Sequence, residues 1–216
     1  MNRIIQTTLA AMILAGLSLP ARSADAPAKA LYFNDFEQTP EGDVPGDLLI
    51  LSGSFTIKKV DGNNVMELPG DPLDGFGVIY GPAEAPAASA RIFATSTAKR
   101  SPEFGIGLGD SGGYRLSVMP AVGQIQIVRG DDVLAQVPFT WKTGTWTHLK
   151  IQSRKLADGS IVVEGKAWTG DDKEPAAWAI TAKATEAISG KASVWGAPYS
   201  STSVRFDDLA VSAAEE

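Results

Sequence analysis

Short stretches of alternating apolar and polar residues, each closed by turn residues, constrain the fold of this chain more than any other feature. They recur about every 8–15 residues, separated by clusters such as Asp61-Gly-Asn-Asn64 and Arg129-Gly-Asp-Asp132. Successive side chains of a β-strand point to opposite faces, so a period of two indicates strands that bury one face. Many short strands with turn signals at this spacing predict an all-β protein, a sandwich of two antiparallel sheets.

The pattern predicts a single domain over residues 25–212, followed by a disordered tail at 213–216. The stretch Pro82-Ala-Glu-Ala-Pro86 has the composition of a loop, but alternation resumes on both sides of it, so it does not divide the chain. We place strands at 30–37, 48–58, 64–68, 76–80, 89–97, 103–109, 113–119, 124–129, 133–137, 145–154, 160–168, 178–182, 190–196 and 203–212.

Residues 1–24 have the three parts of a secretory signal peptide: Arg3, an apolar run at 4–19 and a small-residue region at 21–26. The apolar run is shorter than the roughly 20 residues that a membrane-spanning helix needs. We therefore predict a signal-peptide helix that is cleaved after Ser23 or Ala24, with an uncleaved anchor as the alternative. The mature protein is expected in the periplasm or outside the cell, with no contact to the membrane after cleavage.

Cysteine and charge counts exclude several classes of protein. The chain has no cysteine, which excludes a disulfide framework and a lipid attached through cysteine. Its formal net charge is −6, and the loss of Arg3 and Arg22 with the signal peptide makes the mature chain more acidic still. An acidic chain without a basic cluster is a poor partner for nucleic acid or an anionic membrane.

The segment 145–168 predicts a hairpin with one apolar and one mixed face. A five-residue connection at 155–159 would give three cross-strand pairs on the mixed face: Trp146 with Trp168, His148 with Lys166, and Lys150 with Glu164. Two tryptophans beside charged groups are typical of a surface that stacks on sugar rings and hydrogen-bonds their hydroxyls. This makes Trp146, Lys150, Glu164, Lys166 and Trp168 the candidate carbohydrate-binding residues. The alternative is that these tryptophans only pack in the core or at its rim.

The last predicted strand changes the face that it buries. Val204 and Phe206 are at even positions, whereas Leu209 and Val211 are at odd positions, so the apolar side chains would change from one face of the strand to the other. This change predicts a β-bulge between Asp207 and Asp208.

The first and last strands of a sandwich often lie side by side, so Asp35 or Glu37 could meet Asp207 near this bulge. Clustered carboxylates at strand ends are typical of calcium sites. We therefore take these three residues as candidate ligands of a structural calcium ion. Two alternatives stay open: that they are ordinary surface acids, or that Asp35 and Glu37 form a glycosidase pair.

Two matches to catalytic signatures share one segment, and we interpret both as accidental. Gly109-Asp-Ser-Gly-Gly113 resembles the sequence around the serine nucleophile of chymotrypsin-like proteases, and the overlapping Gly107-Leu-Gly109-Asp-Ser-Gly112 resembles a dinucleotide-binding loop. The flanking residues predict two strands rather than a strand and a helix, so Ser111 is expected in a hairpin turn. The only histidine, His148, is expected to be structural and hydrogen-bonded.

Several short sequence motifs together resemble the concanavalin A-like lectin and glucanase superfamily, in particular its laminin G-like members. They are Gly144-Thr-Trp146-Thr-His-Leu-Lys-Ile151, Gly165-Lys-Ala-Trp168 followed by Glu174-Pro-x-x-Trp178, Ser189-Gly-Lys191 before Val194-Trp195, Phe206-Asp-Asp-Leu-x-Val211, Phe33-Asn-Asp-Phe-Glu37 and Phe104-Gly-Ile-Gly-Leu108. The resemblance implies a jelly-roll sandwich whose concave sheet holds sugar in many members. Glucanases of the superfamily carry Glu-x-Asp-x-x-Glu or Glu-x-Asp-x-Glu on a central strand, and this sequence contains neither string.

The resulting hypothesis is an exported, non-catalytic module that binds carbohydrate or the surface of an exported protein partner. One alternative is a glycoside hydrolase acting on a polysaccharide or on a modified disaccharide, such as the 3-keto-disaccharides bound by some members of the superfamily. Another is a structural or adaptor subunit of an exported complex.

Overall fold

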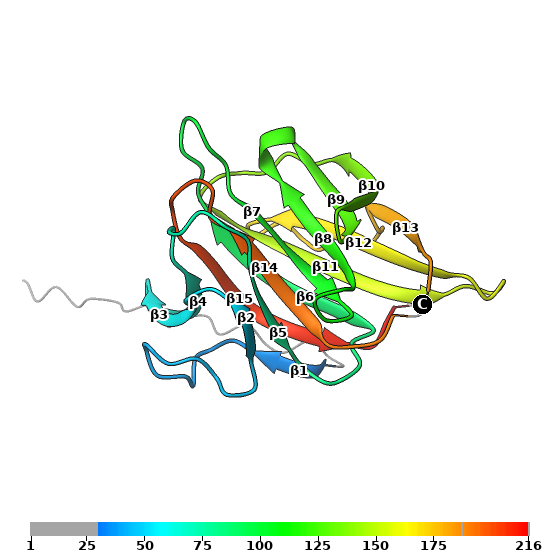
Figure 1. Ribbon diagram of the computed structural model, residues 1–216, viewed down its shortest axis with the longest axis horizontal. Coiled ribbons are helices and arrows are strands. Elements are labelled where there is room, and N and C mark those ends of the chain that lie inside the picture. The colour runs from blue at the N-terminus through cyan, green and yellow to red at the C-terminus, as the bar shows by residue number, and fades with distance from the viewer. Residues whose placement is uncertain (1–29, 187, 216) are drawn as a thin grey trace, which may run out of the picture.

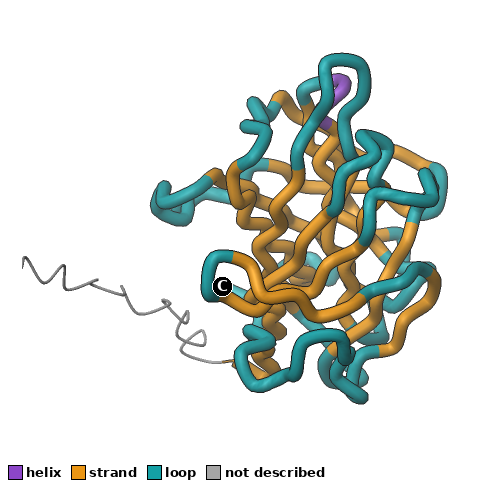
Figure 2. Tube along the Cα trace, turned by 90° about the vertical axis from the view of Figure 1, so that its left-hand side faces the viewer, coloured by secondary structure: helices purple, strands orange, loops and turns teal. Residues whose placement is uncertain are grey.

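Two antiparallel β-sheets packed face to face form the structure, a computed structural model that describes residues 30–186 and 188–215 (Figure 1). The strands make up the body of the molecule, and the loops surround them (Figure 2). The predicted signal peptide at 1–24 lies outside the described residues. Within the described part of the chain, no helix is long and apolar enough to cross a membrane.

We call the two sheets sheet A and sheet B. Sheet A runs, in spatial order, through β13 (Ile180–Ala184), β12 (Ile161–Thr169), β11 (Thr145–Lys155), β6 (Ala87–Ala94), β15 (Val204–Ser212), β4 (Asn63–Leu68) and β3 (Thr56–Val60), and β1 (Ala30–Asn34) also pairs with β15. Sheet B runs through β10 (Asp132–Pro138), β9 (Gln124–Arg129), β8 (Tyr114–Met119), β7 (Glu103–Leu108), β14 (Ala192–Ala197), β5 (Phe76–Tyr80) and β2 (Leu49–Ser52). A 3-10 turn, η1 (Pro120–Val122), connects β8 and β9.

The period of two places the core between the sheets. In β7, Phe104, Ile106 and Leu108 are at most 2% exposed, whereas Glu103 and Gly105 have the opposite parity and face outward. Burying the apolar set removes about 1.5–3 kcal/mol of hydration cost per large side chain, which stabilises the sandwich. The predicted fold class is confirmed, as is the pairing of the first strand with the last.

One predicted strand proved to be two. The stretch 48–58 divides into β2, in sheet B, and β3, in sheet A. The break falls at Gly53, which has a φ of +101°, in the left-handed region that favours glycine. A Cβ atom at this position would also lie 3.0 Å from the rings or Cβ of Phe55 and Phe76. The chain therefore turns here and passes from one sheet to the other.

The predicted register of the β11–β12 hairpin was wrong by two residues. The observed pairs are His148 with Trp168, Lys150 with Lys166 and Gln152 with Glu164. The turn begins one residue later than predicted, because Lys155 still pairs with Ile161. The turn is closed by two backbone hydrogen bonds between residues 156 and 159 and between 156 and 160.

The predicted bulge in the last strand is confirmed. The pairing of β15 with β6 shifts between Asp207 and Ala210, and Asp208 has a φ of +52°. The shift explains how Phe206 and Leu209 both point into the core.

The described part of the tail, residues 213–215, contacts β11, and its predicted disorder stays a prediction. There, the backbone N–H of Glu215 donates to the side chain of Gln152 on β11 over 2.7 Å.

Candidate functional site

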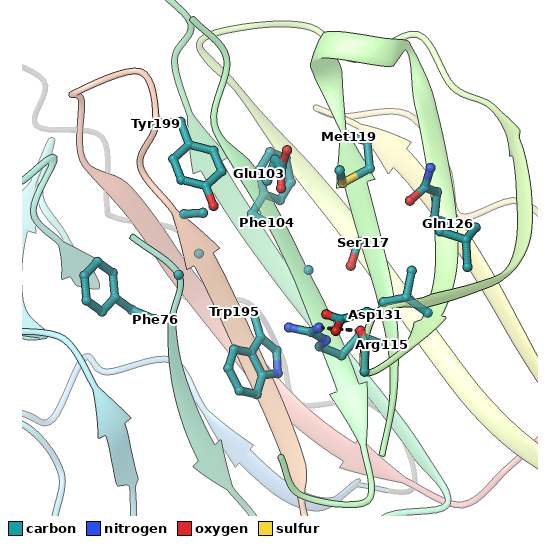
Figure 3. Close-up of a pocket in the computed structure, with 17 residues that line it drawn as sticks. Phe76, Glu103, Phe104, Arg115, Ser117, Met119, Gln126, Asp131, Trp195 and Tyr199 are labelled. Carbon is teal, nitrogen blue, oxygen red and sulfur yellow. Dashed lines mark hydrogen bonds between the residues drawn. The ribbon is translucent and has the colours of Figure 1, made fainter. Parts of the chain in front are cut away.

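The outer face of sheet B carries a hollow of about 420 Å³, shown in Figure 3. Its lining comes mainly from β5, β7, β8, β9 and β14, with Asp131 and Tyr199 contributed by loops. The charged and aromatic residues among those that line it are Glu103, Arg115, Asp131, Phe76, Phe104, Trp195 and Tyr199, of which Phe104 directs its side chain into the core. We call this hollow the trough.

Strand register explains why the outer face is hollow here. One cross-strand row runs Gly77, Trp195, Gly105, Ser117, Gln126 and Gln136, from β5 to β10. Strands lie about 4.8 Å apart, so Trp195 and Gln126, three strands apart, are separated by roughly 14 Å along the row. Between them stand only the small residues Gly105 and Ser117. The trough therefore has a flat floor with an aromatic ring at one end and an amide at the other (Figure 3).

Trp195 is held in a fixed orientation. Its indole Nε1 donates to Ser193 Oγ over 2.9 Å. The ring lies against Gly77, where a Cβ atom would come within 2.7 Å of the indole. The guanidinium carbon of Arg115 lies 4.8 Å from the ring centroid, a cation–π distance. A ring whose position is fixed before binding loses little entropy when a ligand stacks on it.

Glu103 is the isolated charge of the trough. It pairs with Ala197 on β14, and its carboxylate has no hydrogen-bond or ion-pair partner in the described part of the chain. Partial burial raises the pKa of this carboxyl above its ordinary value, because desolvation disfavours the charged form. Figure 3 shows Glu103 on one side of the trough and Arg115 on the other.

The five residues predicted for carbohydrate binding lie on the opposite side of the molecule, in sheet A. Trp168 stacks on His148, with ring centroids 5.1 Å apart and planes at 8°. Trp146 packs against Phe93 at 5.6 Å, and the guanidinium of Arg91 lies 4.6 Å from its ring. These rings thus contact protein neighbours on the surface of sheet A.

The charged members of the predicted set are paired with protein groups. Lys150 and Lys166 both contact Glu174, at 3.0 and 2.7 Å, and both also contact Glu215. Glu164 accepts hydrogen bonds from Arg154 and Gln152. Of the five, Lys150 and Trp168 line one hollow of about 250 Å³, and Trp146 lines another of about 230 Å³. The structure therefore brings them to one face but not into one site.

One of the candidate calcium ligands, Asp207, is already paired with a cation of the protein. Asp207 is fully buried, and Arg91 donates to its carboxylate over 2.6 Å while also reaching Asp208 at 2.7 Å. Asn63 donates to the same oxygen of Asp207. Glu37 accepts from the backbone N–H of Asn64.

Among residues 30–186 and 188–215 there is no group of three or more acidic, histidine or cysteine side chains placed to hold a metal ion. The guanidinium of Arg91 already supplies positive charge to Asp207. A calcium ion held by Asp35, Glu37 and Asp207 stays a prediction, for which a shift of thermal unfolding on chelation is the test.

The protease-like segment forms a turn, as expected. Ser111 lies between β7 and β8 of sheet B, whereas His148 is on β11 of sheet A. His148 Nε2 lies 3.1 Å from the carbonyl oxygen of Gly170. Burial lowers the pKa of its imidazole, which favours the neutral form. Serine and histidine thus belong to different sheets.

Sequence reasoning missed Trp195, Arg115 and Glu103 as a group. The sequence did carry a signal, because odd and even positions of a strand face opposite sides of the sheet. Ser193 and Trp195 alternate with buried Val194, and Glu103 and Gly105 alternate with buried Phe104. Parity shows that these residues face outward. It does not show that β7 and β14, far apart in the sequence, lie side by side.

Comparisons with known proteins agree on the architecture. No protein-family model and no curated protein matches the chain. Among solved structures, the carbohydrate-binding module CBM66 from Bacillus subtilis has a TM-score of 0.53 and 10% identity, covering 76% of this chain and 93% of that one. The Emp46p carbohydrate recognition domain, in potassium-bound form, has a TM-score of 0.53 and 10% identity over 87% of this chain and 98% of that one.

The PL-14 alginate lyase from the marine Aplysia kurodai also matches, with a TM-score of 0.55 and 8% identity over 87% of this chain and all of that one. Likenesses at this identity establish the fold. The chain has the concanavalin A-like jelly-roll fold. In this jelly roll, the trough occupies the outer face of sheet B, and the residues predicted from the hairpin occupy the outer face of sheet A.

Proposed function

We propose that this jelly roll is an exported, non-catalytic module that binds carbohydrate in the trough, with Trp195 as the stacking platform. The observation that carries the proposal is the fixed ring of Trp195 at the end of a floor of small residues. The apolar face of a pyranose packs on an aromatic face, and the flat floor leaves room for a sugar ring beside it.

Polar groups around the platform support the same function. Ser117 offers a neutral donor and acceptor along the row, and Gln126 offers its amide oxygen, since its Nε2 already donates to Gln124 and Gln136. Glu103 offers an acceptor with no protein partner in the described part of the chain. Sugar sites combine such groups with an apolar surface, because the polar groups fix orientation and the ring provides contact area. Two of the similar solved structures, a carbohydrate-binding module and a carbohydrate recognition domain, support this class of ligand.

The test compares the two faces of the protein. Trp195→Ala removes the platform of the trough, and Trp168→Ala removes the candidate platform of sheet A. We expect Trp195→Ala to weaken binding to glycans on an array by tenfold or more, about 1.4 kcal/mol or more. Trp168→Ala should leave binding within about twofold of wild type, a change of less than about 0.5 kcal/mol.

Other results would show that the binding site lies elsewhere or that neither candidate platform binds the ligand. Loss of binding in Trp168→Ala alone would move the site to the residues that the hairpin predicted. Binding that neither substitution weakens would exclude both platforms. Circular dichroism of both variants shows whether the sandwich is still folded.

The hydrolase alternative is tested separately. Asp35 and Glu37 do not line the trough, so the proposed sugar site does not place them beside the ligand. Turnover of a polysaccharide that is abolished by Asp35→Asn or Glu37→Gln would favour the hydrolase over the binding module.

A further inference from the structure

The side chains that line the trough carry more negative than positive charge. Of the residues that line it, Glu103 and Asp131 carry carboxylates, and Arg115 carries the only positive charge. A ligand in the trough therefore meets an excess of negative charge. The whole chain has the same sign, with a formal net charge of −6, which adds to the repulsion of anionic ligands.

Arg115 is already engaged with the protein. Its Nη2 donates to the carbonyl oxygen of Gly130 over 3.4 Å, and its guanidinium carbon lies 4.8 Å from the centroid of Trp195. To reach an anionic sugar, Arg115 would have to leave these contacts. It acts as a support for the platform ring and is a poor counter-ion for a ligand carboxylate.

Glu103 is placed differently. Its partner on β14, Ala197, carries no charge, and neither does Met119, which lines the trough at the end of β8. The floor residue Gly105, two positions along β7, leaves the space in front of Glu103 open. Its carboxylate is half-buried and without a protein partner in the described residues. A partly desolvated carboxylate gains from a cation brought next to it, because the pair interacts in a lower effective dielectric than water.

Resting on the carbohydrate function proposed above, we infer that the trough selects sugars that carry an ammonium group over neutral sugars, and rejects uronates, with Glu103 as the counter-ion. An ammonium group beside Glu103 forms a charge-assisted hydrogen bond, which is roughly twice as strong as a neutral one. A uronate places a second carboxylate in a trough that already has an excess of negative charge. The ligand class is a hexosamine oligosaccharide with free amino groups.

The experiment uses oligosaccharides of one linkage that differ in charge. Isothermal titration measures binding of the full mature chain to β-1,4-linked oligomers of glucose, of glucosamine and of N-acetylglucosamine, and to a β-1,4-linked mannuronate oligomer prepared from alginate as the uronate. We expect glucosamine oligomers to bind about tenfold more tightly than glucose oligomers, and alginate to bind most weakly. The preference for glucosamine over glucose should be greatest where the sugar amine is protonated and Glu103 is still ionised, and it should fall as pH is lowered further through the raised pKa of Glu103.

Two carboxylate variants isolate the counter-ion. Glu103→Gln keeps the size of the side chain but removes its charge, so it should lower the affinity for glucosamine oligomers more than that for glucose oligomers and remove the preference between them. Asp131→Asn removes the other carboxylate of the trough, which is exposed, and should change the preference by less than about threefold, or about 0.6 kcal/mol.

Failure of the charge inference can be distinguished from failure of the proposed sugar site. If Trp195→Ala abolishes binding but alginate binds as well as glucosamine, or Glu103→Gln keeps the glucosamine preference, the inference on charge is wrong and the sugar site stands. If none of the oligomers binds, or Trp195→Ala binds them all like wild type, the proposed site is wrong and the inference falls with it.

Discussion

At the scale of single residues, Asp207 shows how burial and neighbouring charges act on one carboxyl. Burial raises its pKa to about 6, which is opposed by the guanidinium of Arg91 on β6 and by the hydrogen bond from Asn63 on β4. Asp208, next in the chain, acts in the same direction as burial because its charge is negative. The ionised form of Asp207 is thus held in the sandwich at a cost, and Arg91 offsets part of it.

This residue predicts a pH-dependent stability. The pKa of Asp207 is higher in the folded state than its ordinary value of 3.8, so the folded protein binds the proton more tightly than the unfolded chain. Its contribution to stability is therefore fully present below about pH 4 and is lost as pH rises through about 6. We expect the difference in unfolding free energy between wild type and Asp207→Asn to change by on the order of 2 kcal/mol over this range.

Urea unfolding at a series of pH values measures this difference. A difference that stays constant across the range would show that Asp207 titrates alike in the folded and unfolded states. Asp132→Asn is the control, because Asp132 is exposed at the start of β10.

At the scale of elements, the β11–β12 hairpin carries a cluster of charges on its outer face. The side chain of Lys166 is only 3% exposed, and its ammonium contacts Glu174, Glu215 and the carbonyl oxygen of Pro175. It also lies 4.4 Å from the ring centroid of Trp178. The loop after β12 and the C-terminal tail therefore supply the counter-ions that allow a lysine to be buried on this strand.

Glu174→Gln should destabilise the hairpin. The change removes the nearest carboxylate from buried Lys166 and leaves its charge only partly compensated, at an expected cost of about 1–2 kcal/mol at neutral pH. Neighbouring lysines lower the pKa of Glu174, so this contribution is present above its ordinary pKa and is lost as pH falls through the lowered value.

Denaturant midpoints at neutral and acidic pH measure the effect. Glu41→Gln, at an exposed position, should change the midpoint little at either pH. Equal midpoints for Glu174→Gln and wild type at neutral pH would mean that Glu215 alone compensates Lys166.

At the scale of the whole molecule, the two sheets approach closely where a glycine faces a large side chain. Gly165 on β12 points into the core opposite Leu116 of β8, in the other sheet. A Cβ atom at Gly165 would lie 2.7 Å from a methyl group of Leu116 and 3.1 Å from Ile180. Leu116 is fully buried and Ile180 nearly so, hence neither can move aside freely.

Gly165→Ala should therefore destabilise the sandwich by overpacking, at about 1–3 kcal/mol. Gly46→Ala is the matched control, because no atom lies within 4 Å of a Cβ built at Gly46. Thermal unfolding compares the two variants. A Gly165→Ala protein as stable as wild type would show that the sheets can separate at this point without cost.

Most of the strands could be predicted because their signal is local. Alternation over a few residues defines which side chains are buried, and a change of parity between Phe206 and Leu209 was enough to predict the bulge. The division at Gly53 escaped prediction because alternation alone does not report a positive φ. The hairpin register also escaped, because a turn that starts one residue later shifts every pair by two positions.

The sequence by itself determined that this chain forms two stacked sheets with one apolar interior, since a period of two requires a face to bury. Only the tertiary structure decided which outer face is hollow and which charges are already paired. Trp195, Gly77 and Glu103 come together through the pairing of β5, β14 and β7, and Lys166 meets Glu215 because the tail returns along β11. Such contacts join distant segments whose order across a sheet depends on the packing of the whole chain, and local periodicity carries no information on that order.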